Sequence, residues 1–360
     1  MPDNNITAGT NNSAPESQPA QNKRAPWIFL FAITLAIVLL YLTLRGLDWR
    51  SFWNTIRNGN YELLLITIPI ASLNYFIRAT RWSVLIRSEK KVSVISIFWA
   101  NMVGYLGNSY LPARAGELLR SAFLGREKGL GVSFVLATAL TERALDVVAL
   151  VIIGSLALLG QGAIPPELQN AVRITALIGL VGLVIILVMP HQEKLAFKIL
   201  GKLPLSEKLQ TVLSKQLSRF LTGMRSLQNT KRLITFITLT IVIWLVDALA
   251  NVIGVHIIGQ SLNIGQALIL LAALGLSSAI PSTPGYIGVY QFVAVTVLVP
   301  FGFSKPDALA YIIIGQILNY LVITFWGLIG LWQINRVHQG LGISTNDIPA
   351  ENHNHSIESG

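Results

Sequence analysis

Long stretches without a charged residue constrain this chain more than any other feature of its sequence. Residues 27–44 (WIFLFAITLAIVLLYLTL) contain no charge over 18 positions. About 20 apolar residues in a helix cross the ~30 Å of a bilayer's hydrocarbon core. Further apolar runs lie near 61–77, 92–111, 130–159, 174–189, 233–258, 262–280, 286–303 and 308–334. The sequence therefore predicts an all-α, polytopic integral membrane helix bundle with about 6–8 spans.

The composition excludes a soluble enzyme of this length. The 360 residues are 52% apolar and only 12% charged, whereas a soluble domain carries about 25% charged residues. There is no cysteine, which excludes disulfides and thiolate chemistry. The net charge of +10 comes from cations between the apolar runs, so we expect no nucleic-acid partner.

The two ends of the chain differ from its centre. Residues 1–26 and 337–360 are polar, and we expect a disordered tail at each end around an integral membrane domain at 27–336. His353 and His355 lie in the second tail without further ligands, so we expect no metal site and no cofactor.

The cations predict which loops share one side of the membrane. Clusters at Arg78–Lys91, at Arg114–Lys128 and within 191–232 should all face the cytoplasm of a bacterial inner membrane, together with both termini. The run at 92–111 then has cytoplasmic flanks on both sides, so it is either a re-entrant hairpin or a helix in the interface. The 191–232 segment is itself amphipathic, with apolar residues at helical spacing between lysines.

A short internal repeat favours hairpins. Ser109–Gly116 and Ser278–Gly285 share the pattern S-x-(L/I)-P-x-x-x-G after an apolar limb. The first copy enters from the inside and the second from the outside, which predicts two opposed re-entrant hairpins in an inverted repeat, as in many secondary transporters. The alternative is two ordinary helix ends marked by proline and glycine.

Charged residues inside the run 130–159 point to a site. Glu142, Arg143 and Asp146 lie there, with Glu142 about 18 Å along the helix, near the bilayer centre. Glu142 and Asp146 are four apart and share a face. Charges at this depth need partners or a water-filled cavity. They form either a polar cavity that handles a charged group or a proton, or an ion cluster that only locks helices together.

Asn108–Arg120 is the densest polar stretch near the membrane. Pro112 and Gly116 interrupt the helix there and free backbone groups. Arg114 and Arg120 have the guanidinium geometry that holds a phosphate, and Glu117 would orient one of them. The alternative is a cytoplasmic cap in which these arginines and Glu117 pair with each other. Likewise, Arg78 and Arg81 either serve the same phosphate or act as interfacial anchors beside Trp82.

The second half offers a lone acid and an uncharged break. Asp247 is the only charge in the run 233–258. Pairing with Arg143 would give it the lowest free energy inside the membrane. The second break supplies only hydroxyls, an amide and free backbone groups; its candidate residues are Pro281, Thr283, Pro284, Gly285 and Gln291.

Four motifs in order carry a family resemblance: R-x-x-R-W at Arg78–Trp82, N-x-x-L-P-x-R-x-G-E-x-x-R at Asn108–Arg120, E-R-x-x-D at Glu142–Asp146 and P-x-T-P-G-x-I-G-V at Pro281–Val289. They resemble the membrane region of bacterial lysylphosphatidylglycerol synthases and the flippase-like proteins that have this region alone. Two positions depart from the family pattern. Ala113 stands where glycine is usual, and Gln291 stands where glutamate is frequent.

The resemblance implies a flippase-like transporter. In the two-part synthases this region is understood to move aminoacylated phospholipid between leaflets, while a soluble domain attaches the amino acid. About 25 residues follow the last apolar run here, so we expect no aminoacylating domain and no enzymatic activity. The expected partners are membrane lipids, either a phospholipid or a polyprenyl-linked lipid. The alternatives are an accessory subunit for a lipid-modifying synthase or glycosyltransferase, and an enzyme of lipid phosphates. The sequence leaves the oligomeric state open.

Overall fold

The computed structural model describes residues 25–111, 115–161, 192–202, 206–278 and 283–340, with parts of 173–188. Within these ranges the chain is helical and contains no strand. The helices are α1 (Ala25–Leu44), α2 (Trp49–Arg57), α3 (Leu64–Ile86), α4 (Val94–Tyr110), α5 (Gly116–Lys128), α6 (Val132–Gly160), α8 (Glu193–Lys202), α9 (Glu207–Met224), α10 (Thr230–Val255), α11 (Ile264–Ser277), α12 (Val289–Leu298) and α13 (Lys305–Gly340). Short 3-10 turns are η1 (Tyr61–Leu63), η4 (Arg225–Gln228), η5 (His256–Ile258), η6 (Pro284–Tyr286) and η7 (Val299–Phe301).

Four helical segments in these ranges are long and apolar enough to cross a membrane. They are Tyr61–Ile86, Val132–Gly160, Thr230–Ile258 and Lys305–Arg336. A fifth candidate is the pair Ala32–Leu44 and Trp49–Arg57, which is bent by 91°. The polytopic helical membrane fold is thereby confirmed. The predicted run 174–189 is described only in part, so the count of 6–8 spans stays a prediction.

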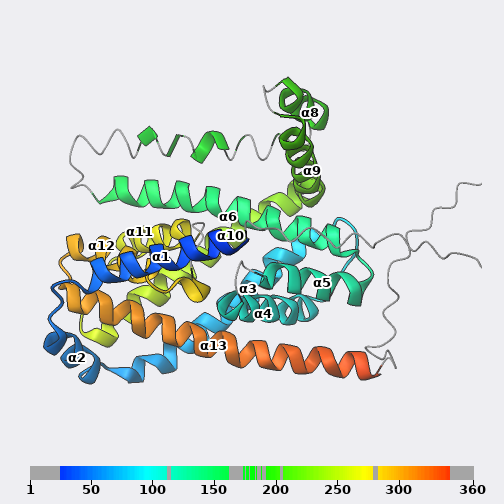
Figure 1. Cartoon of the computed structure of the whole chain (residues 1–360). Coiled ribbons are helices and arrows are strands. Elements are labelled where there is room, and N and C mark those ends of the chain that lie inside the picture. Colours follow the sequence, from blue (N-terminus) through cyan, green and yellow to red (C-terminus); the bar gives the residue numbers. More distant parts are fainter. Residues whose placement is uncertain are drawn as a thin grey trace, which may run out of the picture.

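Two helical hairpins enter this bundle from opposite ends. In Figure 1, α4 and α5 fold back on each other at one end of the long helices, and α11 and α12 do so at the other end. α4 has 17 residues, α11 has 14 and α12 has 10, fewer than the ~20 that a full crossing requires. Each hairpin therefore reaches only part of the way through the bundle.

The packing between helices relates the two halves of the chain. α3–α6 form one half and α10–α13 form the other. The first hairpin packs its α4 on α13, and the second packs its α11 on α6. The flanking helices α3 and α10 pack on each other. When the two halves are exchanged, the contact of α4 with α13 becomes the contact of α11 with α6. Since the two hairpins also enter from opposite ends, the structure has the predicted inverted repeat.

Apolar side chains in the described residues concentrate in two large cores, one near each end of the bundle, and in a small cluster of Leu150, Trp244 and Ala272. One lies among the ends of α3, α4, α5 and α6, and the other among α2, α11, α12 and the start of α13. Buried members of the first include Trp82, Leu85, Met102 and Met224, and those of the second include Phe52, Leu270, Leu298 and Leu309. Two arginines of the polar network described below contact the first core directly, Arg120 at Trp82 and Arg81 at Phe236.

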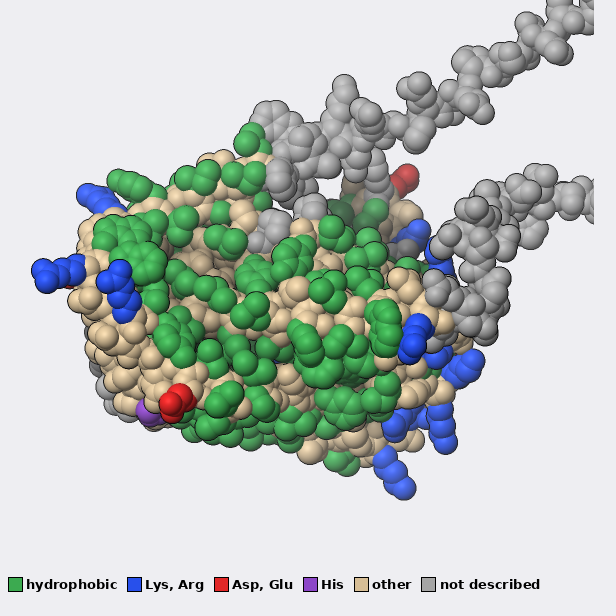
Figure 2. Space-filling view, turned by 90° about the horizontal axis from the view of Figure 1, so that it is seen from below, with side chains coloured by type: hydrophobic (Ala, Val, Ile, Leu, Met, Phe, Trp, Pro, Cys, Tyr) green, Lys and Arg blue, Asp and Glu red, His purple; other side chains and the backbone are tan. Residues whose placement is uncertain are grey.

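The surface divides into an apolar band and two charged ends. Figure 2 shows apolar side chains across the middle, with lysine and arginine at both ends. The end where α3 and α5 finish is the richer in cations: Arg87, Lys90, Lys91, Arg126, Lys128, Arg225, Lys231 and Arg232. At the other end, Arg45, Arg50, Arg57 and Lys305 are offset by Asp48, Glu62 and Asp307. The cationic end is the one that the sequence predicts to face the cytoplasm.

The first hairpin closes through a contact that only glycine permits. A Cβ atom on Gly116 would lie 1.9 Å from the Gly104 carbonyl oxygen and 2.6 Å from the Asn108 backbone nitrogen. Such distances are far inside van der Waals contact, so α4 and α5 approach each other at this point without room for a methyl group. The glycine that the sequence marks as a helix break therefore also sets the spacing of the hairpin.

We predict that Gly116→Ala lowers the stability of the protein by about 1–3 kcal/mol, because the added methyl group forces the hairpin apart. The thermal unfolding midpoint of the purified protein in detergent measures this. Gly315→Ala is the matched control, since a Cβ there meets nothing within 4 Å, and its midpoint should stay unchanged or rise slightly. Equal midpoints for Gly116→Ala and the wild type would contradict the close approach.

Candidate functional site

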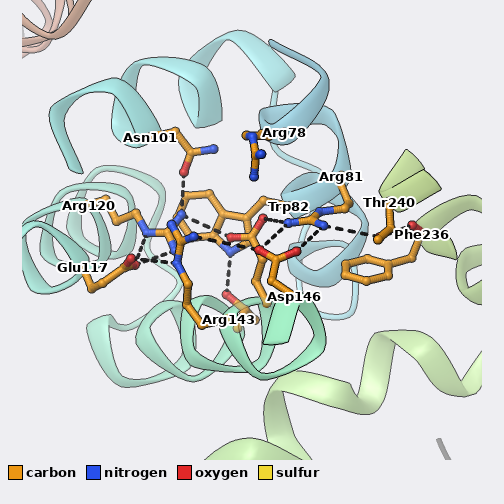
Figure 3. A network of polar contacts seen from close by, with 12 residues as sticks. Arg78, Arg81, Trp82, Asn101, Glu117, Arg120, Arg143, Asp146, Phe236 and Thr240 are labelled. Carbon is orange, nitrogen blue, oxygen red and sulfur yellow. Dashed lines mark hydrogen bonds and ion pairs between the residues drawn. The ribbon is translucent and has the colours of Figure 1, made fainter. Parts of the chain in front are cut away.

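The centre of the site is a pair of carboxylates on α6 that share one arginine of α3. Glu142 and Asp146 lie one helical turn apart, and both accept from Arg81. The Arg81 guanidinium binds Asp146 at 2.6 and 3.0 Å and Glu142 at 3.0 Å (Figure 3). The side chains of Arg81 and Glu142 are each 1% exposed. The predicted sharing of one helix face by the two acids is thus what allows a single arginine to bridge them.

Arg120 is a second fully buried arginine, and it shares Glu142 with Arg81. It donates to Glu117 at 2.6 Å, to Asn101 at 2.7 Å and to Glu142 at 3.3 Å. Its guanidinium also lies 4.4 Å from the ring centre of Trp82, whose indole donates to Thr138 at 3.1 Å. These contacts join α4, α5 and α6 to α3 and leave Arg120 only 1% exposed. Because its donors already face protein groups, Arg120 holds the helices together and does not face the cavity described below.

Arg143 connects the α6 acids to the first hairpin. Its Nε donates to Glu117 at 3.0 Å, and its Nη1 lies 3.8 Å from Asp146. At 33% exposure, it is more accessible than Arg81 or Arg120. Glu117 therefore receives Arg120 from one side and Arg143 from the other, which fixes α5 against α6.

Asp247 pairs with Arg78, and this corrects an expectation from the sequence. Its carboxylate accepts from Arg78 at 2.6 Å and also from the Asn74 side chain. We expected Arg143 as the partner, but Arg143 donates to Glu117 instead, at 3.0 Å. Since α3 and α10 pack directly on each other, Arg78 is the nearer cation. The Arg78 guanidinium also lies 5.2 Å from the ring centre of Trp244.

Positive and negative side chains balance in this network. Its cations are Arg78, Arg81, Arg120 and Arg143, and its anions are Glu117, Glu142, Asp146 and Asp247. Each of them has at least one ion-pair partner in the described residues, as Figure 3 shows for most of the set. An uncompensated charge at such depth would cost several kcal/mol. The network is therefore self-neutralising.

A cavity of about 400 Å³ adjoins one side of the network. Of the charged residues it exposes Arg78, Glu117, Arg143, Asp146 and Asp247, and it leaves Arg81, Arg120 and Glu142 behind its wall. The remaining polar lining is largely amide and phenol groups: Asn74, Tyr75, Tyr105, Asn108, Ser109, Ser278, Tyr286, Tyr290, Gln316, Asn319 and Tyr320. Both hairpins and all four long spans contribute, so the cavity lies where the two halves of the repeat meet.

The second break supplies an uncharged counterpart to the first. Gly285 and Gly288 have positive φ values of 69° and 89°, and the Gly285 carbonyl accepts from Gln316 at 3.2 Å. Gln291 accepts from the Gly288 amide at 2.7 Å and donates to Gln316. The Thr283 hydroxyl donates to the Ile287 carbonyl at 2.8 Å. Gly285 and its partner Gln316 line the cavity, whereas Thr283 and Gln291 shape the break without lining it.

Some predicted residues lie outside the described part of the chain. Pro112, Arg114 and Pro281 are among them, and the Pro284 side chain is not described either. The phosphate-binding role of Arg114 therefore stays a prediction. Within the described ranges, no three His, Asp or Glu side chains are grouped to hold a metal ion.

The sequence analysis missed most of the uncharged lining. Asn74 is four residues before Arg78, so the two share a face of α3 and both reach Asp247. Gln316, Asn319 and Tyr320 interrupt the apolar run 308–334 at helical spacing. Polar side chains three and four residues apart within a membrane span could have predicted that one face of the helix lines a polar cavity.

Comparison with known proteins agrees with the geometry. The family model described as the lysylphosphatidylglycerol synthase TM region matches residues 29–327. That range includes both hairpins, the ion-pair network and the cavity. The match does not reach the polar segments at either end of the chain.

Several curated proteins of similar sequence are described as UPF0104 membrane proteins. A UPF0104 membrane protein of Pyrococcus horikoshii is 23% identical over 322 residues, covering 83% of this chain and 94% of its own length. One from Methanothermobacter thermautotrophicus is also 23% identical, covering 84% and 91%. One from Methanocaldococcus jannaschii is 26% identical, covering 64% and 94%. No solved structure matches the chain. On the family match over residues 29–327, the chain belongs to the family of the lysylphosphatidylglycerol synthase TM region.

Proposed function

We propose that this membrane protein is a lipid transporter that carries the polar headgroup of a phospholipid or polyprenyl-linked lipid through the central cavity, while the lipid tails stay in the hydrocarbon. The observation that carries the proposal is the cavity of about 400 Å³, lined by charged, amide and phenol groups from both halves of an inverted repeat. Its volume lies in the range of small-molecule sites, about 300–1,000 Å³. A lipid headgroup is of this class.

The physical need for such a cavity comes from the headgroup. A phosphate that leaves the interface loses its hydration, and an isolated anion in a medium of low dielectric constant is prohibitively costly. A transporter must therefore offer fixed donors and neutralising charge along the path. Arg78 and Arg143 reach the cavity and provide both. Arginine binds phosphate through two parallel hydrogen bonds, as it binds carboxylate.

The two accessible arginines differ from the two buried ones in what they can do. Arg81 and Arg120 are each bound to two carboxylates and are 1% exposed. Among the acids of the described ranges, Arg78 is bound to Asp247 alone, in a pair whose side chains are 14% and 24% exposed. A phosphate in the cavity competes with Asp247 for Arg78. Arg143 also pairs with two carboxylates, but it is 33% exposed and lines the cavity. We therefore assign headgroup binding to Arg78 and Arg143, and the maintenance of the fold to Arg81 and Arg120.

The opposed hairpins supply a route to both sides. One hairpin enters from each end of the bundle, and residues of both hairpins line the cavity. In transporters built from inverted repeats, rocking of one half against the other opens a central site alternately to each side. The family membership supports a role in handling lipids but does not specify it. The competing proposals are an accessory subunit and a lipid-phosphate enzyme, and lipid turnover by the reconstituted protein separates the latter from transport.

We predict that Arg78→Gln lowers lipid translocation roughly ten- to a hundred-fold, because charge-assisted hydrogen bonds are worth about 1.5–3 kcal/mol each. Accessibility of a fluorescent phospholipid in proteoliposomes to an external quencher gives the rate. Arg87→Gln is the control, since Arg87 follows the end of α3 and lies outside the cavity. A wild-type rate in a well-folded Arg78→Gln protein would rule out headgroup binding by Arg78.

The buried ion pairs of Glu142 should matter for the stability of the protein, in contrast to the binding role of Arg78. We predict that Glu142→Gln destabilises the protein by about 3–5 kcal/mol, since it leaves Arg81 and Arg120 short of a counter-charge. Asp247→Asn, at a partly exposed site, should cost markedly less stability. Unfolding midpoints in detergent compare the two variants. Equal losses of stability in the two variants would show that the whole network serves the fold and that no part of it is set aside for binding.

The predicted orientation places both termini and the 191–232 segment in the cytoplasm of a bacterial inner membrane. A cysteine replacing the exposed Lys215 should react with a membrane-impermeant thiol reagent only after cells are opened. The native chain has no cysteine, so there is no background labelling. Glu62→Cys, beyond the opposite end of α3, is the matched position and should react in intact cells. Labelling of the Lys215→Cys protein in intact cells would reverse the orientation.

A further inference from the structure

Helices α8 and α9 form an arm that leaves the bundle. Figure 1 shows them stacked across the direction of the long spans, at the end where α6 and α10 begin. Large apolar side chains are exposed along this arm: Leu195 at 50%, Ile199 at 56%, Leu209 at 45% and Val212 at 50%. The two helices contact each other, and α9 meets α6. Much of the apolar surface of the arm thus has no protein cover in the described structure.

The arm is amphipathic with its cations beside the apolar face. At 3.6 residues per turn, Leu209 and Leu213 lie on one side of α9 and Thr211 on nearly the opposite side. Lys194, Lys198 and Lys215 are exposed. Over 191–232 the sequence holds nine lysines and arginines but only two acids, Glu193 and Glu207. Apolar side chains flanked by cations are typical of helices that lie in a membrane interface.

The attachment of α9 to α6 fixes the depth of the arm. The Thr141 hydroxyl donates to the Phe220 carbonyl at 3.3 Å, and a Cβ on Gly223 would lie 2.7 Å from the Ala137 carbonyl oxygen. Ala137 and Thr141 are five and nine residues into the span that begins at Val132. These positions correspond to about 8 and 14 Å from its end. The contact at Ala137 therefore lies within the roughly 5–10 Å at which interfacial helices bury their apolar face, and the contact at Thr141 lies somewhat deeper.

We propose that α8 and α9 bind the surface of anionic phospholipid, with Leu195, Ile199, Leu209 and Val212 inserted among the acyl chains and the lysines on the phosphates. The charge of the arm and its depth together favour lipid over a soluble protein. A partner in the water phase would meet only the part of the arm above the interface. The proposal is independent of what the central cavity carries.

The test uses the full-length protein with one fluorescent label on an introduced cysteine, Leu209→Cys or Thr211→Cys. Each is reconstituted into phosphatidylcholine vesicles with or without phosphatidylglycerol and with quencher-bearing lipid tails. The label at position 209 should be strongly quenched and blue-shifted in anionic vesicles, and the label at position 211 much less. High salt, or Lys194→Gln with Lys198→Gln and Lys215→Gln, should remove most of the quenching at position 209.

Three results would overturn the proposal. They are equal quenching at positions 209 and 211, no dependence on phosphatidylglycerol, and burial of position 209 only after a cytosolic extract is added. The last would show a soluble partner instead of lipid. Translocation by the same proteoliposomes is recorded separately, so a failure of the transport proposal is distinguishable from a failure of this one.

Discussion

The structure depends on the sharing of one arginine by two carboxylates inside the membrane domain. Arg81 bridges Glu142 and Asp146 at 2.6–3.0 Å, with almost no exposure. None of the three groups could be buried alone, because an unpaired charge at that depth costs several kcal/mol. Their neutralisation fixes α3 against α6. It also lets Arg120, which shares Glu142, attach the first hairpin to the same place.

The two halves of the repeat use different chemistry at equivalent positions. The first hairpin is tied to α6 through Glu117 and Arg143, whereas the second is tied to α13 through Gln291, Gln316 and the Gly285 carbonyl. Ion pairs hold one side of the cavity and neutral amides hold the other. Neutral hydrogen bonds are weaker than charge-assisted ones, so the polar contacts that hold the second hairpin are weaker than those that hold the first.

Much of this arrangement could be predicted from the sequence, because charge is so costly in a membrane. The cation clusters around the run 92–111 predicted an even number of crossings, and a hairpin is found there. The run itself forms only the first limb, α4; the second cluster lies in the returning limb, α5, so Arg120 is buried in the network and does not face the cytoplasm as expected. The spacing of Glu142 and Asp146 predicted their common face. The partner of Asp247 could not be predicted, because the choice between Arg78 and Arg143 depends on the packing of α3 against α10. The tyrosine and amide lining was missed for a similar reason, since single polar residues in a span show no partner until the helices pack.

The central claim is that a lipid headgroup enters the cavity, and blocking that space tests it most directly. Ser278 lines the cavity, whereas Ile317 is 55% exposed on the outside of α13. Ser278→Cys and Ile317→Cys would each be reconstituted and treated with a bulky thiol reagent before lipid translocation is measured. We expect modification at position 278 to stop translocation, excess lipid to slow that modification, and modification at position 317 to have no effect. Unchanged translocation with position 278 fully modified would contradict the account.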